Sequence, residues 1–138
     1  MTEDIWVELE KAARQVMKQA YAPYSDFRVG AALRGADGSI SIGCNVENAA
    51  FPAGFCAERA AVAGAVSRGI RLFTHLVIAT EADAATPPCG MCRQMFVEFD
   101  AAGDLEILSV TRDGARAQWR LADLAPAPFT NTSLAHHS

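Results

Sequence analysis

Cysteines stand at the starts of two separate helical segments, and this strongly constrains how the chain can fold. Residues 56–68 are rich in alanine, contain no proline and are followed by Gly69, which predicts a helix beginning at Cys56. A second predicted helix, over residues 89–101, begins at Cys89 and carries Cys92 one turn later. Cysteines three residues apart at a helix start share one face, so they can bind the same metal ion.

The rest of the chain alternates helical and strand patterns. Apolar residues spaced by three and four predict an amphipathic helix over residues 3–20, stopped by Pro23. Short apolar runs predict five strands, over residues 27–33, 40–46, 75–80, 105–111 and 118–121. This order predicts an α/β fold, a three-layer α/β/α sandwich around a mixed five-stranded sheet. We expect one domain over residues 1–130 and a flexible polar tail over residues 131–138.

Charge and hydropathy narrow the class of protein. Twelve basic and sixteen acidic residues give a net charge of -4, with no run of lysine or arginine, which argues against nucleic-acid binding. The N-terminus has no signal-peptide pattern and no stretch is apolar enough to span a membrane, so we expect a cytoplasmic protein. In a reducing compartment such cysteines more often bind metal than form disulfides. Cys44, alone in a strand pattern, is interpreted as a small buried hydrophobe.

Three thiolates from Cys56, Cys89 and Cys92 predict a catalytic Zn²⁺ site. Tetrahedral zinc with three protein ligands keeps one position for water, whereas structural sites have four protein ligands. A Cys-x-x-Cys pair alone also occurs in redox and structural zinc sites, so the third cysteine decides the interpretation. No fourth ligand is obvious, because His75 lies in a predicted strand and the other histidines lie in the tail.

Two charged residues follow the first cysteine. Glu58 is close to the predicted metal, with its side chain expected to point away from that of Cys56, and can move protons between a metal-activated water and a leaving group. The alternative is a solvated helix acid. Arg59 lies on the same helical face as Cys56, where it can donate to thiolate sulfur and offset its charge. Arg93 is a weaker candidate for that role, and either arginine can instead be a surface cation.

These residues and several further blocks resemble the homotetrameric zinc-dependent cytidine deaminases. The matching blocks cover nearly the whole chain in the family's order: residues 20–25, Phe27, and residues 29–33, 43–49, 56–59 and 88–94. The resemblance implies hydrolytic deamination of cytidine and 2′-deoxycytidine to uridine and 2′-deoxyuridine, with release of ammonia. It also implies a role in pyrimidine salvage, a catalytic domain over residues 1–130 and a homotetramer.

The resemblance further implies a set of substrate-binding residues. Asn45 and Glu47 would bind the ribose hydroxyls, Phe27 would flank the base and the backbone of Ala57 would meet the amide edge of the pyrimidine. Phe129 would reach the base bound by a neighbouring subunit. For Phe27 and Phe129 the alternative is packing in the core.

One segment departs from the family pattern and leaves the substrate open. Residues 51–55 lack the usual tyrosine and contain a Pro-x-Gly sequence before Cys56, so another cytosine nucleoside such as blasticidin S is an alternative substrate. A structural zinc module is a more remote alternative, which would need a fourth ligand. A base deaminase acting on nucleic acid is disfavoured by the acidic charge.

Overall fold

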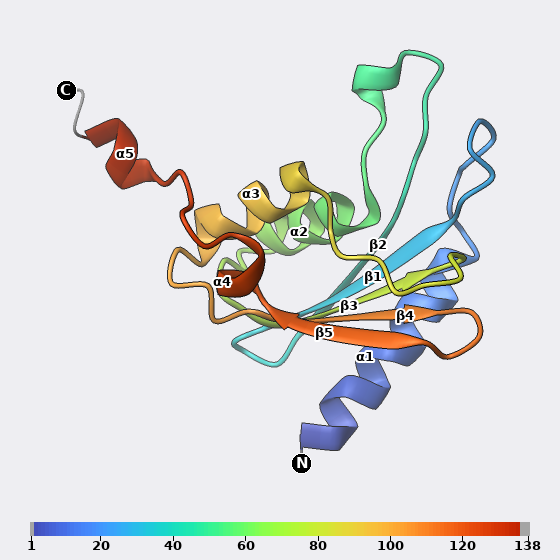
Figure 1. Cartoon of the computed structure of the whole chain (residues 1–138), viewed down its shortest axis with the longest axis horizontal. Coiled ribbons are helices and arrows are strands. Elements are labelled where there is room, and N and C mark those ends of the chain that lie inside the picture. Colours follow the sequence, from blue (N-terminus) through green and yellow to red (C-terminus); the bar gives the residue numbers. More distant parts are fainter. Residues whose placement is uncertain (1, 136–138) are drawn as a thin grey trace.

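A five-stranded mixed sheet forms the middle layer of the computed structural model, which describes residues 2–135 (Figure 1). The strand order is β2-β1-β3-β4-β5; β3 and β4 are parallel and the other neighbours antiparallel. The strands are β1 (Val29–Gly35), β2 (Ile40–Cys44), β3 (Phe73–Thr80), β4 (Glu106–Thr111) and β5 (Arg116–Arg120). The predicted mixed five-stranded sheet is confirmed.

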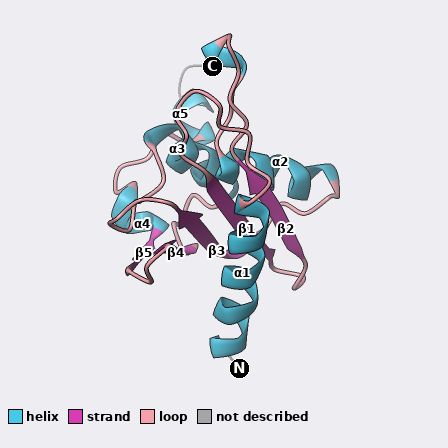
Figure 2. Ribbon diagram, turned by 90° about the vertical axis from the view of Figure 1, so that its right-hand side faces the viewer, coloured by secondary structure: helices cyan, strands magenta, loops and turns pink. Residues whose placement is uncertain are grey.

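Helices cover both faces of this sheet (Figure 2). Helix α1 (Thr2–Met17) packs on one face, and α2 (Ala57–Ser67) and α3 (Gly90–Phe99) lie on the other. Three short helices complete the structure: η1 (Phe51–Ala53), α4 (Leu121–Leu124) and α5 (Asn131–Ala135). The predicted three-layer sandwich is therefore confirmed.

Alternation along the strands builds a separate apolar cluster on each face. In β3, Leu76 and Ile78 belong to the cluster under α2 and α3, whereas Val77 and Ala79 belong to the cluster under α1. Successive side chains of a strand point to opposite faces, so one central strand serves both cores. All four side chains are buried, as expected for a strand covered on both sides.

Two glycines let helices approach the β1–β2 hairpin closely. A Cβ on Gly30 would lie 2.1 Å from the carbonyl oxygen of Ala13 in α1. A Cβ on Gly43 would lie 2.6 Å from the carbonyl oxygen of Ala57 and 2.5 Å from the amide nitrogen of Ala61, both in α2. These separations leave no room for a side chain, so Gly43 sets how closely the first turn of α2 lies on the sheet.

Several predicted boundaries differ from the structure. Helix α1 ends at Met17 rather than Ala20, because the chain turns there through hydrogen bonds such as that from the Ala20 amide to the Met17 carbonyl. Strand β1 begins at Val29 instead of residue 27, and β2 ends at Cys44 instead of residue 46. Beyond β2, Val46 forms isolated bridges with two distant segments, which a local strand pattern does not reveal.

The C-terminal region also differs from the prediction. The last strand covers Arg116–Arg120 rather than residues 118–121, and Leu121 begins α4. Within the predicted flexible tail, Asn131–Ala135 forms α5, while residues 136–138 lie outside the described residues. The division of the chain at residue 130 stays a prediction.

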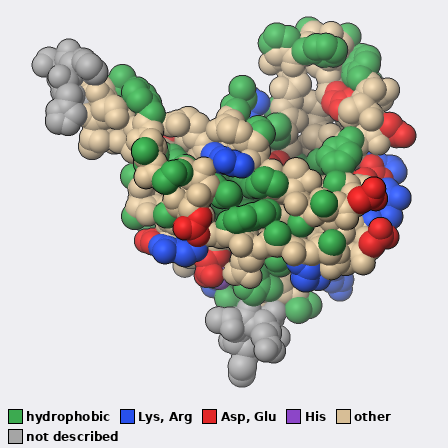
Figure 3. Space-filling model, viewed as in Figure 1, with side chains coloured by type: hydrophobic (Ala, Val, Ile, Leu, Met, Phe, Trp, Pro, Cys, Tyr) green, Lys and Arg blue, Asp and Glu red, His purple; other side chains and the backbone are tan. Residues whose placement is uncertain are grey.

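Two segments project from the body of the molecule. The segment that carries η1 extends well beyond the sheet, and α5 extends from another side (Figure 1). A hollow lies between the η1 segment and the body (Figure 3). None of the described helices combines the length and apolar character needed to cross a membrane.

Candidate active site

The three predicted metal ligands come together at two helix starts. Cys56 and Cys89 are the N-cap residues of α2 and α3, and Cys92 lies in the first turn of α3. The Sγ atom of Cys89 lies 4.0 Å from that of Cys56 and 3.6 Å from that of Cys92, and all three Sγ atoms lie within 4.8 Å of one another. Zn–S bonds of about 2.3 Å at tetrahedral angles require S–S separations of roughly 3.8 Å.

The donor set therefore fits zinc with an open position. Three soft sulfur ligands in this geometry match the preference of Zn²⁺. Within residues 2–135, no fourth histidine, cysteine or carboxylate joins the cluster. A structural zinc site would have four protein ligands, so the geometry favours a catalytic centre.

The local electrostatics favour a thiolate at Cys56. Interactions with the neighbouring Cys92 and Cys89 thiols, together with the charge of Arg59, lower the pKa of Cys56 to about 6 despite its burial. The interaction with Cys56, together with burial, raises the pKa of Cys92. The positive ends of α2 and α3 point toward the cluster and stabilise negative sulfur there.

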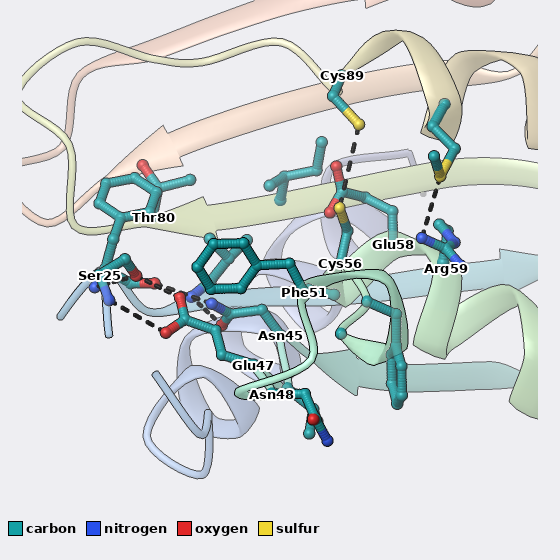
Figure 4. Close-up of a pocket in the computed structure, with 18 of the residues that line it drawn as sticks. Ser25, Asn45, Glu47, Asn48, Phe51, Cys56, Glu58, Arg59, Thr80 and Cys89 are labelled. Atoms are coloured by element: carbon teal, nitrogen blue, oxygen red, sulfur yellow. Dashed lines mark hydrogen bonds between the residues drawn. The ribbon is translucent and has the colours of Figure 1, made fainter. Parts of the chain in front are cut away.

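Glu58 lies beside this cluster in the same cavity (Figure 4). Its side chain is buried, with a residue exposure of 6 %, and burial raises its pKa to about 7. The expectation that Glu58 points away from Cys56 is wrong, because its carboxylate lies toward the Cys56 sulfur and is affected by its charge (Figure 4). Cys56 is an N-cap with extended backbone angles (φ -77°, ψ 157°), so helical spacing does not apply between the two residues. A carboxyl group with a pKa near neutrality can both accept and donate a proton.

The two arginines make contacts that the sequence did not predict. Arg59 donates from Nη1 to the Met91 sulfur at 3.1 Å, so the predicted hydrogen bond to a cysteine sulfur is absent among the described contacts. Its charge still lowers the pKa of Cys56. Arg93 donates to the carbonyl oxygens of Pro88 at 2.8 Å and Leu124 at 3.2 Å. Arg93 therefore ties the segment before Cys89 to the C-terminal region.

A cavity of about 780 Å³ opens from the cysteine cluster toward the loop before β1. Most of the predicted site residues line it: Phe27, Asn45, Glu47, Cys56, Ala57, Glu58, Arg59 and Cys89. Cys92 is fully buried behind its wall. Phe51 and Phe55 add aromatic surface from the projecting segment. Phe129 does not line this cavity in its own chain; it is 56 % exposed and lies along a groove beside α3.

The polar end of the cavity is an ordered hydrogen-bond network. The Asn45 side chain accepts from the Val29 amide and donates to the Phe27 carbonyl oxygen, each at 2.9 Å. Glu47 accepts from the backbone amides of Tyr24 at 3.0 Å and Ser25 at 3.1 Å, and from the Ser25 hydroxyl. The hydroxyl and amide of Ser25 hold the pKa of Glu47 below its usual value.

Ser25 is a further cavity residue whose role its sequence position, within a block that matches the family, did not predict. Its hydroxyl also accepts from the Phe27 amide at 3.1 Å, so it joins Glu47 to the residue expected to flank the base. The sequence signal for Ser25 is its position two residues before Phe27. Thr80 and Thr86, which line the cavity from β3 and the following loop, were also missed. Their contribution depends on long-range packing rather than on a local pattern.

Comparison with known protein sequences agrees with this geometry. The family described as the cytidine and deoxycytidylate deaminase zinc-binding region matches residues 6–104. A cytidine deaminase from Sporosarcina psychrophila is 39% identical over 124 residues, covering 90% of each chain. A probable cytidine deaminase from Dictyostelium discoideum is 41% identical over 131 residues, covering 92% of this chain and 87% of the relative.

Solved structures give the same result. The crystal structure of cytidine deaminase from Burkholderia pseudomallei superposes with a TM-score of 0.84 at 39% identity, covering 88% of this chain and 97% of the other. That of cytidine deaminase from Mycobacterium tuberculosis has a TM-score of 0.77 at 36% identity, covering 90% and 96%. The predicted fold, zinc cofactor and enzyme class are confirmed, and the chain belongs to the cytidine and deoxycytidylate deaminase family.

Proposed function

We propose that this protein deaminates cytidine and 2′-deoxycytidine hydrolytically, giving uridine or 2′-deoxyuridine and ammonia. The observation that carries the proposal is the position of Glu58, which is buried next to three clustered cysteines and lines a cavity of about 780 Å³, large enough for a nucleoside. The membership of the family and the names of its relatives support the same reaction. Such a reaction belongs to pyrimidine salvage. The free thiols suit a reducing cytoplasm, where we place the enzyme.

Glu58 moves the protons of this reaction. Zn²⁺ held by Cys56, Cys89 and Cys92 would supply an activated water molecule. The Glu58 carboxylate takes a proton from the attacking water and delivers it to N3 of the cytosine ring. A second proton passes through the same carboxyl group to the amino nitrogen at C4. A C–O bond thus forms at C4, the C–N bond breaks, and water and cytidine become uridine and ammonia.

The shape of the cavity orients the nucleoside. The cysteines and Glu58 lie at one end, and Asn45 and Glu47 lie at the other (Figure 4). The base is placed toward Glu58, between Phe27 and the Ala57 backbone, and the ribose toward Glu47. A carboxylate oxygen accepts more than one hydrogen bond, so Glu47 can hold the loop at residues 24–25 and also accept from a ribose hydroxyl.

We propose that the active enzyme is a homotetramer in which Phe129 completes a neighbour's site. Two projecting segments carry exposed apolar side chains, including Phe51 at 79 % exposure, Phe129 and Leu134. Exposed apolar surface of this kind is typical of interaction sites. Phe129 lies outside its own cavity, which agrees with a role in another subunit.

A substrate panel tests the activity. The purified protein is given cytidine, 2′-deoxycytidine, cytosine, cytidine 5′-monophosphate and blasticidin S, and both the cytosine absorbance band and released ammonia are followed. We expect both nucleosides to be preferred, because free cytosine has no ribose hydroxyl to bind Asn45 and Glu47, and a phosphate would be repelled by Glu47. Each lost hydrogen bond to a charged group should lower catalytic efficiency on the order of tenfold to a hundredfold.

The outcomes of the panel are distinct. Equal efficiency on cytosine and cytidine would contradict the ribose-binding roles. Activity confined to blasticidin S would favour the alternative substrate and point to the unusual segment at residues 51–55. Glu47→Ala should weaken cytidine turnover while leaving zinc content unchanged, and equal losses of both would contradict the placement of Glu47 at the ribose.

A further inference from the structure

A row of three charged residues crosses the sheet just beyond the cavity. Val29 of β1 pairs with Thr80 of β3, and Thr80 pairs with Thr111 of β4. Arg28 lies one position before Val29, and Glu81 and Arg112 lie one position after Thr80 and Thr111. Because β1 runs antiparallel to β3 and β4 runs parallel to it, the sheet register places these three residues side by side. Glu81 occupies the middle of the row.

The Glu81 carboxylate is fully engaged by its two neighbours. Its Oε1 accepts from the Arg28 backbone amide at 2.8 Å and from Arg28 Nε at 3.3 Å. Its Oε2 accepts from Arg28 Nη2 at 3.1 Å and from Arg112 Nη2 at 2.5 Å. The side chain is only 11 % exposed. A carboxylate in this arrangement holds the backbone at Arg28 as well as pairing two positive charges.

The backbone group that Glu81 holds is also held from inside the cavity. The Arg28 amide and the Phe27 carbonyl belong to one planar peptide group. Glu81 accepts from the N–H of that group, and Asn45 Nδ2 donates to its carbonyl oxygen at 2.9 Å. One peptide plane is thus fixed from both ends, by a cavity residue and by a residue outside the cavity lining. Its orientation sets the direction of Phe27 and the position of Asn45.

We propose that Glu81 is a positioning residue for nucleoside binding. It acts through the Phe27–Arg28 peptide and keeps Phe27 and Asn45 in the geometry that receives the base and ribose. This role rests on the proposed function, because it concerns the nucleoside end of the cavity. Glu81 makes none of its described contacts with the cysteines or Glu58, so its loss should affect substrate binding rather than zinc binding or proton transfer.

Kinetics of Glu81→Ala and Glu81→Gln test the proposal. We expect Glu81→Ala to raise KM for cytidine on the order of tenfold, with kcat within about twofold of wild type, because the lost contacts serve binding. Glu81→Gln should raise KM less, since its amide oxygen can still accept from the Arg28 N–H. Zinc content should stay at the wild-type level in both variants.

Two control variants separate positioning from ion pairing. Glu10 also pairs with two arginines, Arg14 and Arg116, but holds no peptide of the cavity, so Glu10→Ala should leave KM unchanged. Arg28→Ala removes the guanidinium and keeps the backbone N–H that Glu81 binds. We expect it to raise KM less than threefold, clearly below the effect of Glu81→Ala.

Each result decides the matter. Unchanged KM in Glu81→Ala, an equal rise in Arg28→Ala or Glu10→Ala, or a fall in kcat together with zinc loss would each overturn the positioning role. If Glu81→Ala fails to fold, Glu81→Met takes its place, because it keeps the volume of the side chain and removes both carboxylate oxygens. A KM rise no larger in Glu81→Met than in Arg28→Ala overturns the role. Wild-type protein that does not turn over cytidine would instead contradict the proposed function itself.

Discussion

Two carboxylates share the cavity, and their surroundings move their pKa values in opposite directions. Burial raises the pKa of Glu58 to about 7. Hydrogen bonds from Ser25 and Tyr24 lower the pKa of Glu47. One group can therefore exchange protons near neutral pH, while the other stays ionised and accepts hydrogen bonds. Such a separation supports the proposed roles, with acid–base work for Glu58 and ribose binding for Glu47.

Replacing Glu58 with glutamine tests its role at the scale of one residue. Glu58→Gln keeps the size of the side chain and loses the ability to exchange protons, so fold and zinc content should be preserved. Turnover of cytidine should fall by about a hundredfold to ten-thousandfold. Steady-state kinetics and metal analysis on the same preparation measure both quantities. Activity within a few-fold of wild type would show that another group moves the protons.

Removing one sulfur ligand should remove the metal. Cys89→Ala leaves only two thiols in the cluster, so we expect loss of zinc and of thermal stability, because ligand binding is coupled to folding. Cys44→Ala is the matched control, since Cys44 is a free cysteine outside the cluster and should keep one zinc per chain. Full zinc retention in Cys89→Ala would contradict its assignment as a ligand.

The residues of the site could be predicted from sequence, but the directions in which some of their side chains point could not. Cysteines at two helix starts were enough to predict the metal ligands. The direction of Glu58 was predicted wrongly because Cys56 lies outside the helix as an N-cap. The contact of Arg59 with Met91 joins two helices, so spacing within one helix gave no sign of it.

At the scale of elements, Gly43 controls how closely α2, the helix that carries Glu58, packs on the sheet. Its missing side chain lets the Ala57 carbonyl and the Ala61 amide lie directly over β2. A methyl group there must push the first turn of α2 outward, together with Glu58. The packing of one glycine on the sheet thus reaches the catalytic end of the cavity.

Gly43→Ala should therefore be costly in both stability and activity. We expect a loss of about 1–3 kcal/mol in the free energy of unfolding from overpacking, and a lower kcat. Gly64→Ala on the same helix is the control, because its added methyl group meets no atom within 4 Å. It should stabilise by about 0.5–1 kcal/mol. Denaturant unfolding and steady-state kinetics measure the free energy of unfolding and kcat of both variants. A Gly43→Ala variant with unchanged stability and kcat would contradict the close packing of α2 on β2.

Long periodic elements were predictable, whereas the short ones were not. Helix α1 and the core strands have clear apolar repeats, and their existence was predicted with shifted boundaries. η1, α4 and α5 span only three to five residues each, too few to show a period. The end of β2 was predicted incorrectly because Val46 forms isolated bridges with Tyr21 and Phe55 rather than continuing the strand. Tyr21 is distant in sequence, and Phe55 follows the loop over residues 47–54, so a local pattern does not show either pairing.

At the scale of the whole molecule, the projecting segments predict assembly. Phe129→Ala should lower catalytic efficiency on cytidine by about tenfold, because each subunit would lose a stacking aromatic supplied by its neighbour. Deleting residues 136–138 leaves Phe129 and both projecting segments in place, so it should leave activity unchanged and serves as the control. Light scattering should report a tetramer for the wild type. A fully active monomer would contradict both the assembly and the role of Phe129.

The cysteine side chains at the two helix starts make the stability of the fold depend on the supply of zinc. Cys56 and Cys89 occupy N-cap positions and make no side-chain capping hydrogen bond there. Serine or aspartate would normally satisfy the free amides at such positions, whatever the metal supply. Here one ion would bind both helix starts together, so chelation should loosen the fold in step with the loss of catalysis. Zinc-starved chains would then be exposed to proteases, and the cell would keep no reserve of folded, inactive enzyme.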